Sequence, residues 1–226
     1  MSDHRERPTR VLSACGIAGP ALFLVVFHLD AFTREGYDVW RHGPSLLMTG
    51  DGGWVQVANF VLTGMAMIAC AIGLRRTVTG WGPRLVAAYG VMMISTGLFR
   101  TDPEEGYPAG TPADRMPGWN YPSSWEHGVH TLSVLVMYAL ATAACFVFAR
   151  RFAAEPGGRP WAVGLAANGV LSPLVLATGM LISGDPDLAA VDGVLGRVII
   201  PLGWVWAAVV PLRLRTAGDR VGTVSS

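Results

Sequence analysis

The sequence predicts an all-α membrane protein, built as a six-helix transmembrane bundle with both termini in the cytoplasm. Hydrophobic residues make up 51% of the chain and charged residues only 15%, whereas soluble domains carry about 25% charged residues. The apolar residues form six long runs, and the arginines gather in alternate connecting segments. Together these three observations exclude an ordinary soluble domain and predict a multi-pass protein of the cell membrane.

Each predicted helix is a run of apolar residues with few charges. The runs cover residues 11–32, 54–74, 85–99, 125–149, 160–182 and 193–212. A crossing needs about 17–25 residues, so we expect the short third run to extend by a turn at one end. The first run exceeds the roughly 7–15 apolar residues of a signal-peptide core, and we interpret it as a retained helix. Residues 11–215 are therefore expected to form one membrane domain between two polar tails, 1–10 and 216–226.

The charges predict the orientation. Twelve of the seventeen arginines lie in or beside the two tails and in the 75–84 and 150–159 loops, while twelve of the sixteen acids lie in or beside the other three loops. Arginine excess marks the cytoplasmic side of a membrane protein. Both termini are then cytoplasmic, as six crossings require. The outer loops, at about 33–53, 100–124 and 183–192, include two that are longer than a hairpin needs, and long loops in compact proteins are usually functional or disordered.

The stretch SSWEHGVHTLSV, residues 123–134, places ionisable groups at the start of the fourth run. Glu126 and His130 are four residues apart and His127 and His130 three apart, so they share one flank of a helix. His130 lies about one and a half turns inside the membrane, where a polar group needs a partner or a water-filled cavity. We interpret His130 as part of a cavity wall. Glu126 and His127 fit either the lip of that cavity or an ordinary wet interface.

Other polar and aromatic residues gather on the same predicted outer side. An interhelical hydrogen-bonding role is the alternative for those inside helices, where such bonds contribute about 0.6–2 kcal/mol each. The candidate catalytic residues are Asp38, Asp102, His130 and Glu126, and the candidate substrate-binding residues are Arg41, Trp54, Gln56, Asn59, His127, Arg197 and Trp204.

Four phrases of the sequence, GYDVWRHGPSLL, GWVQVANFVLTG, GLFRTDPEEGYPAGTP and GVHTLSV, occur in that order along the chain. With them the chain resembles the bacterial integral-membrane family known as domain of unknown function 998, over about residues 10–210. The resemblance implies a six-helix membrane bundle and no established activity. The positions that match its pattern are Asp38, Arg41, Ser45, Gln56, Asn59, Asp102, Pro103 and His130.

The expected function is a membrane-embedded enzyme that acts on a lipophilic, isoprenoid-like substrate, most concretely an acid-catalysed terpene cyclase. Proton-initiated cyclisation needs a carboxyl group held protonated by burial, here Asp38 or Asp102, with His130 as orienting group or base. It also needs aromatic faces that stabilise a carbocation, and the chain has eight tryptophans.

Two alternatives stay open. One is a metal-dependent lipid hydrolase that uses His127, His130, Asp102 and His28, although their spacing matches no established metal motif. The other is a transporter or structural membrane protein without catalysis. We expect no cofactor and no metal, no nucleic-acid partner, and a lipophilic small molecule or membrane lipid as ligand.

Overall fold

The computed structural model describes residues 3–117, 120–182 and 188–224, and these residues form six α-helices and no β-strand. The helices are α1 (Asp3–Thr33), α2 (Gly53–Leu74), α3 (Gly82–Leu98), α4 (Trp125–Ala153), α5 (Arg159–Ile182) and α6 (Ala189–Val224). Of these six, all but the 17-residue α3 are long and apolar enough to cross a membrane. The prediction of an all-α membrane protein is therefore confirmed. The two polar tails continue α1 and α6 as helix, and the predicted 183–192 loop lies largely outside the described residues.

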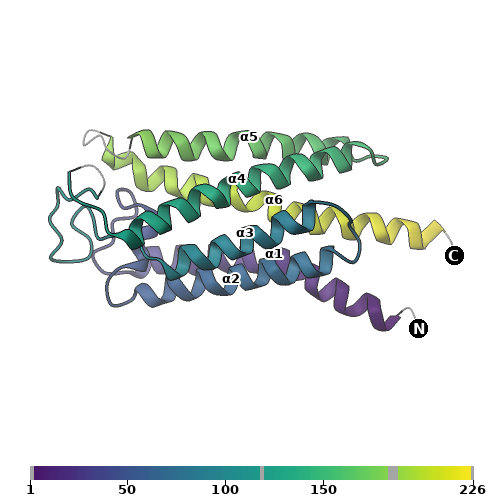
Figure 1. Ribbon diagram of the computed structural model, residues 1–226, viewed down its shortest axis with the longest axis horizontal. Helices are drawn as coiled ribbons and strands as arrows, with labels where there is room; N and C mark the ends of the chain where they lie inside the picture. Colours follow the sequence, from purple (N-terminus) through teal and green to yellow (C-terminus); the bar gives the residue numbers. More distant parts are fainter. Residues whose placement is uncertain (1–2, 118–119, 183–187, 225–226) are drawn as a thin grey trace.

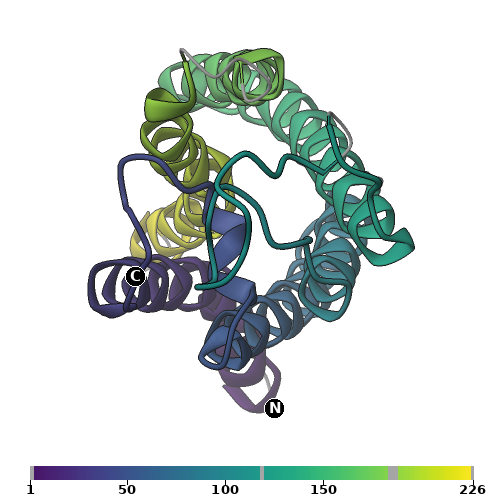
Figure 2. The same cartoon turned by 90° about the vertical axis from the view of Figure 1, so that its left-hand side faces the viewer.

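The six helices form a ring in the order of the chain. Each consecutive pair packs together, and α6 also packs against α1, which closes the ring. In Figure 1 the helices run in alternating directions along the length of the bundle, and the N- and C-termini lie at the same end of it. The two long connections cross over the centre of the ring at the other end (Figure 2). We call the end that these connections cover the loop end and the opposite one the terminal end.

Glycines bring α2 and α3 into close contact. A Cβ added to Gly64 would lie 2.6 Å from the carbonyl oxygen of Gly90, and one added to Gly90 would lie 2.7 Å from the carbonyl oxygen of Gly64. The two backbones therefore touch where both residues lack side chains. Membrane helices commonly pack through small residues in this way, because lipid offers no hydrophobic driving force for helix association.

The long connections, residues 34–52 and the described part of 99–124, fold into a compact cap. A short 3-10 helix, η1 (Pro44–Met48), inserts Leu46, Leu47 and Met48, which are fully buried. The ring of His42 in one connection bonds through Nε2 to the carbonyl oxygen of Glu105 in the other, at 3.2 Å. The cap is therefore one folded unit rather than two independent loops.

Arg34 fastens this cap to the helices. Its guanidinium binds both carboxylate oxygens of Asp30, at 2.7 and 2.9 Å, and donates to the carbonyl oxygen of Gly52 at 2.6 Å. A Cβ at position 52 would lie 2.6 Å from the guanidinium carbon, so the glycine leaves room for this contact. The end of α1 is thereby joined to the start of α2.

Candidate active site

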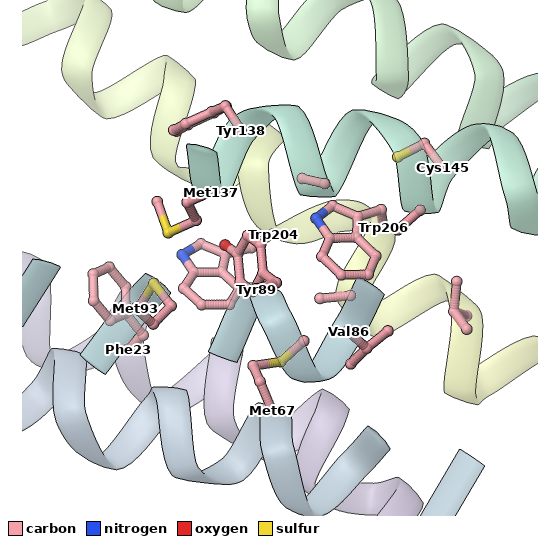
Figure 3. Packing of buried hydrophobic residues seen from close by; sticks show 14 of the residues in the cluster. Phe23, Met67, Val86, Tyr89, Met93, Met137, Tyr138, Cys145, Trp204 and Trp206 are labelled. Carbon is pink, nitrogen blue, oxygen red and sulfur yellow. The ribbon is translucent and has the colours of Figure 1, made fainter. Parts of the chain in front are cut away.

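A cavity of about 420 Å³ lies inside the loop-end half of the ring, with residues of all six helices and the cap in its wall. Small-molecule sites usually have volumes of roughly 300–1,000 Å³. Its deep wall is aromatic: the ring of Phe23 lies 5.0 Å from that of Phe60 and 5.2 Å from that of Trp204, and Tyr89 meets Trp204 edge to face at 5.6 Å. Figure 3 shows Phe23, Tyr89 and Trp204 close together beside Met93 and Met137.

Ser45 and His130 form a hydrogen-bonded pair in the wall of this cavity. The Oγ of Ser45 lies 3.1 Å from Nε2 of His130. The other ring nitrogen, Nδ1, lies 2.9 Å from the carbonyl oxygen of Phe99 and 3.1 Å from that of Thr96. Carbonyl oxygens only accept hydrogen bonds, so Nδ1 carries the proton and the bare Nε2 accepts the hydroxyl of Ser45. This is the relation of a nucleophile to its general base.

The end of α3 orients His130. The last carbonyl groups of a helix have no partner within it and carry the negative end of the helix dipole. Thr96 and Phe99 lie at this end of α3, and their oxygens hold the buried imidazole in one orientation. They also favour a positive charge on the ring. Two carbonyl oxygens thus lie at the ring nitrogen that bonds to a carboxylate in Ser-His-Asp triads.

The cap and α6 together position Ser45. Pro44 begins η1, where its fixed φ suits the first position of a helix, and Leu46–Met48 anchor the segment below. Gly196 of α6 lies so close that a Cβ there would overlap the ring of Pro44. Ser45 is therefore held between a buried anchor and a neighbouring helix.

Asp102 caps the start of α4 instead of facing the cavity. Its Oδ2 accepts the N–H of Ser124 at 2.7 Å, and Ser124 is the N-cap whose hydroxyl accepts the N–H of His127. Asp102 is absent from the cavity wall, so a role as proton donor within the cavity finds no support in its position. Its carboxylate is instead engaged in fixing the turn that aims α4, and with it His130.

His127 does line the cavity, beside this capping network. Its Nδ1 lies 3.2 Å from the backbone nitrogen of Asp102 and 3.1 Å from the hydroxyl oxygen of Thr101. A backbone N–H can only donate, so Nδ1 is the acceptor and the proton of the neutral ring lies on Nε2. The two histidines of α4 are therefore held in opposite tautomers.

The remaining candidates for catalysis lie outside the cavity. Asp38 is exposed, and its Oδ1 accepts the N–H of Trp40 at 2.8 Å in a local turn. Glu126 is exposed in the first turn of α4, where a carboxylate favours the helix dipole. The structure thus brings His130 to the cavity but neither Asp38 nor Glu126, because both side chains are directed to the surface.

Three of the expected substrate-binding residues, Gln56, Asn59 and Trp54, lie outside the cavity. Asn59 is buried and donates to the carbonyl oxygen of Phe23 at 3.1 Å and to Oε1 of the equally buried Gln56 at 3.3 Å, which joins α2 to α1. Trp54 is 69% exposed on the outside of the ring. None of the three belongs to the cavity wall. The interhelical role that the sequence left open therefore fits Gln56 and Asn59 better than substrate binding.

Arg41 and Arg197 support the cap, whereas Trp204 lines the cavity as expected for a substrate-binding residue. Arg41 pairs with the buried carboxylate of Glu105 at 3.5 Å. The guanidinium carbon of Arg197 lies 5.8 Å from the ring centre of Tyr37, within range of a cation–π contact.

The cavity wall also contains polar residues that were not among the sequence candidates, including Ser45, Thr101, Glu104, Glu105 and Thr131. Ser45 did match the family pattern, and that was the one available signal. The surrounding GPSLL has no recognised nucleophile motif. Its partner lies 85 residues further along the chain, so only the folded ring shows the pair.

No three His, Cys, Asp or Glu side chains among the described residues come close enough together to hold a metal ion. Nδ1 of His130 bonds to the carbonyl oxygen of Phe99 at the end of α3, and Nδ1 of His127 bonds to the backbone nitrogen of Asp102 in the segment that follows. The metal-dependent alternative therefore has no ligand set within the described part of the chain.

Comparison with known proteins gives one match. The family model described as "Protein of unknown function (DUF998)" matches residues 17–213, as the sequence resemblance led us to expect. No curated protein and no solved structure matches the chain.

Proposed function

For this chain, which belongs to the DUF998 family, we propose the activity of a membrane-embedded serine hydrolase that cleaves a carboxylic ester of a lipophilic substrate. One observation carries the proposal: Ser45 Oγ lies 3.1 Å from the bare Nε2 of His130 in the wall of a largely apolar cavity. A hydroxyl is a weak nucleophile by itself, and an adjacent base activates it. The apolar wall suits the hydrocarbon part of such a substrate.

In the first half of the reaction, Ser45 Oγ attacks the carbonyl carbon of the ester while its proton passes to Nε2 of His130. The tetrahedral intermediate then collapses, the bond to the alcohol oxygen breaks, and the alcohol leaves with the proton from His130. In the second half, water attacks the acyl–serine ester with His130 again as base. The acid leaves, and Ser45 and neutral His130 are restored, so no oxidant, reductant or metal takes part.

Two features lower the barrier in this mechanism. The carbonyl groups of Thr96 and Phe99 stabilise the imidazolium that forms on His130, through the negative end of the α3 dipole. The Nε2–H of His127, whose Nδ1 is occupied by Asp102 and Thr101, is the donor we assign to the developing oxyanion. Loss of one such donor typically slows acyl transfer by about 10²–10³-fold.

Hydrolysis of a long-chain ester such as p-nitrophenyl palmitate by the purified protein in lipid vesicles tests the proposal. Ser45→Ala should reduce the rate at least about 10²-fold, since the nucleophile is removed. Ser133→Ala is the matched control, because this buried hydroxyl lies one turn from His130, bonds to Ser95 at 2.8 Å and is absent from the cavity wall. Equal rates for the wild type and Ser45→Ala, with both proteins folded, would contradict the proposal.

Terpene cyclisation is the second candidate function, favoured by the aromatic deep wall. The faces of Trp204, Tyr89 and Phe23 are suited to stabilise a carbocation. The proton donor would then be Glu104, which lines the cavity, instead of Asp38 or Asp102, since the carboxylate of Glu105 pairs with Arg41. Incubation with a linear polyprenyl substrate separates the two functions. A cyclase keeps its product in Ser45→Ala and loses it in Glu104→Gln, whereas the hydrolase forms no cyclic product.

The membrane topology that we propose has six crossings, with both termini and the arginine-rich loops in the cytoplasm of a bacterial cell. Support comes from the chain ends, which lie together at the terminal end (Figure 1). Exposed tryptophans mark both ends of the bundle, with Trp54 and Trp125 at one and Trp81, 5.3 Å from the guanidinium carbon of Arg84, at the other. Such aromatic residues favour the two membrane interfaces. Cysteine accessibility in whole cells tests this orientation.

A further inference from the structure

The helices that form the cavity wall are not equally close to one another around the ring. At its loop-end half, α4 and α5 are separated, although the same helices lie together near the 154–158 turn that joins them (Figures 1 and 2). The cavity extends into this space, where α4 contributes Val134 and Leu135 and α5 contributes Gly179 and Met180 to its wall. A Cβ added to Gly179 would meet nothing within 4 Å.

The cavity wall at this place consists of accessible apolar side chains. Leu135 and Met180 belong to the cavity wall and are 41% and 42% exposed, so neighbouring side chains do not cover them. Leu132 on α4 and Leu181 on α5, which lie next to them, are also exposed and apolar. In a membrane-spanning bundle such a surface faces hydrocarbon, since water would not wet it.

We propose that this space between α4 and α5, bounded by Leu135, Gly179 and Met180, is a lateral opening through which the hydrocarbon chain of a membrane lipid enters the cavity. The inference rests on the proposed hydrolase function and names its substrate class: a bilayer lipid with an ester-linked acyl chain. The chain passes from the bilayer between the two helices to the apolar wall, and the ester carbonyl stops at Ser45. Substrate then never has to leave the membrane.

A lateral opening would let the acyl chain reach the cavity without passing through water. Extracting an acyl chain into water costs about 0.8 kcal/mol for each methylene group exposed. A sideways path between helices avoids that cost because the chain stays among apolar groups throughout. The polar reaction is confined to the rim, where Ser45 of the cap lies beside His127 and His130 of α4.

Narrowing the opening tests the inference. Gly179→Trp and, from the facing helix, Leu135→Trp each place an indole in the space, and Gly164→Trp is the control. Gly164 is also on α5 with nothing within 4 Å of an added Cβ, but it is not part of this cavity wall. With a long-chain ester embedded in phosphatidylcholine vesicles, both opening variants should hydrolyse it on the order of tenfold more slowly than the control.

A small reagent separates obstruction from damage to the chemistry. Diisopropyl fluorophosphate has no long chain, so it should label Ser45 at the same rate in Gly179→Trp, Leu135→Trp and the control. Unchanged turnover of the vesicle-bound ester in both opening variants, or a parallel loss of labelling and turnover in them, would overturn the inference.

Photo-crosslinking keeps the test independent of the proposed function. A phosphatidylcholine with a diazirine in its acyl chain, mixed with Ser45→Ala protein in vesicles, should attach to peptides of α4 and α5 that border the opening. Gly179→Trp added to Ser45→Ala should reduce this attachment, and Gly164→Trp should not. Crosslinking with this pattern supports the opening even where Ser45→Ala keeps full hydrolase activity, and crosslinks spread evenly over the outer helix faces contradict it.

Discussion

The contact between α2 and α3 and the space between the loop-end halves of α4 and α5 use glycine in opposite ways. Gly64 and Gly90 bring two backbones together, with each carbonyl oxygen where the other residue's Cβ would be. Gly179 faces a space that holds no atom within reach of an added Cβ. The glycines of α2 and α3 therefore close one side of the ring, whereas on the other side an open space lies beside Gly179. The difference indicates that the closed side supports the fold and the open side serves the cavity.

The largest expected difference between the two sides is in stability. Gly90→Ala places a methyl group against the carbonyl oxygen of Gly64, a backbone atom that cannot move without shifting α2, and should cost about 1–3 kcal/mol of unfolding free energy. Gly179→Ala meets no atom and should be neutral or slightly stabilising, since alanine favours a helix. Thermal unfolding in detergent measures both. Equal destabilisation by the two substitutions would remove the distinction between a closed and an open side.

A glycine at the active site should affect catalysis more than stability. Gly196→Ala pushes the ring of Pro44 away from α6 and moves Ser45 with it. A displacement of about 1 Å can slow a reaction by about 10²-fold, so kcat for the ester should fall by up to that factor. Gly128→Ala on α4, where nothing lies within 4 Å of the added Cβ, is the control and should keep its activity. Rates that are the same in both variants would show that the contact with Pro44 does not position Ser45.

A smaller effect is expected for a buried amide on the closed side. Asn59→Ala removes the hydrogen bonds to the carbonyl oxygen of Phe23 and to Gln56, so the protein should lose about 1 kcal/mol of stability. KM for the ester should not change, because Asn59 lies outside the cavity wall. An increase in KM without loss of stability would instead favour the substrate-binding role that the sequence left open.

The smallest expected effect is a change with pH in the stability that His42 gives to the cap. Burial lowers the pKa of His42 below its ordinary value of 6.5, and its Nδ1 accepts the N–H of Asp38 while Nε2 bonds to Glu105. Asp38 raises this pKa, and Arg41 and Arg197 lower it further. As pH falls below 6.5, the unfolded chain binds a proton that the folded cap excludes, so this stabilising contribution decreases.

His42→Gln removes the titrating group and is the comparison for this effect. The difference in unfolding temperature between wild type and His42→Gln should be larger at pH 7.5 than at pH 5.5, since the other histidines titrate alike in both proteins. A constant difference would show that His42 is not a pH-dependent link between the two halves of the cap.

Much of the fold could be predicted from the sequence because apolar runs determine where membrane helices lie. The run at 54–74 became α2 at Gly53–Leu74, and the short run at 85–99 gained a turn at its start, as its length required. Runs of this kind do not reveal which helices touch. The contact between Gly64 and Gly90 depends on the rotation of two helices about their axes, and nothing in the hydropathy pattern encodes that rotation.

The candidate site was harder to predict for the same reason. The sequence predicted His130 to be part of a cavity wall, because a histidine at that depth needs a partner, and the structure has it in the wall of the cavity. Asp102 resembled a catalytic acid, but a carboxylate beside a helix start serves equally well as a cap, and its bond to Ser124 shows this role. Ser45 matched the family pattern but lies in no nucleophile motif, and its partner comes from a helix 85 residues away.

The central claim is that Ser45 is a nucleophile activated by His130, and the site of covalent labelling tests it most directly. Wild-type protein in vesicles would be treated with an alkyl fluorophosphonate and digested, and the modified peptide would be identified by mass spectrometry beside that of His130→Ala. The account predicts phosphonylation of Ser45 in the wild type and at least about 10²-fold slower labelling in His130→Ala. Folded wild-type protein that stays unlabelled at Ser45, or a labelling rate unaffected by His130→Ala, would contradict it.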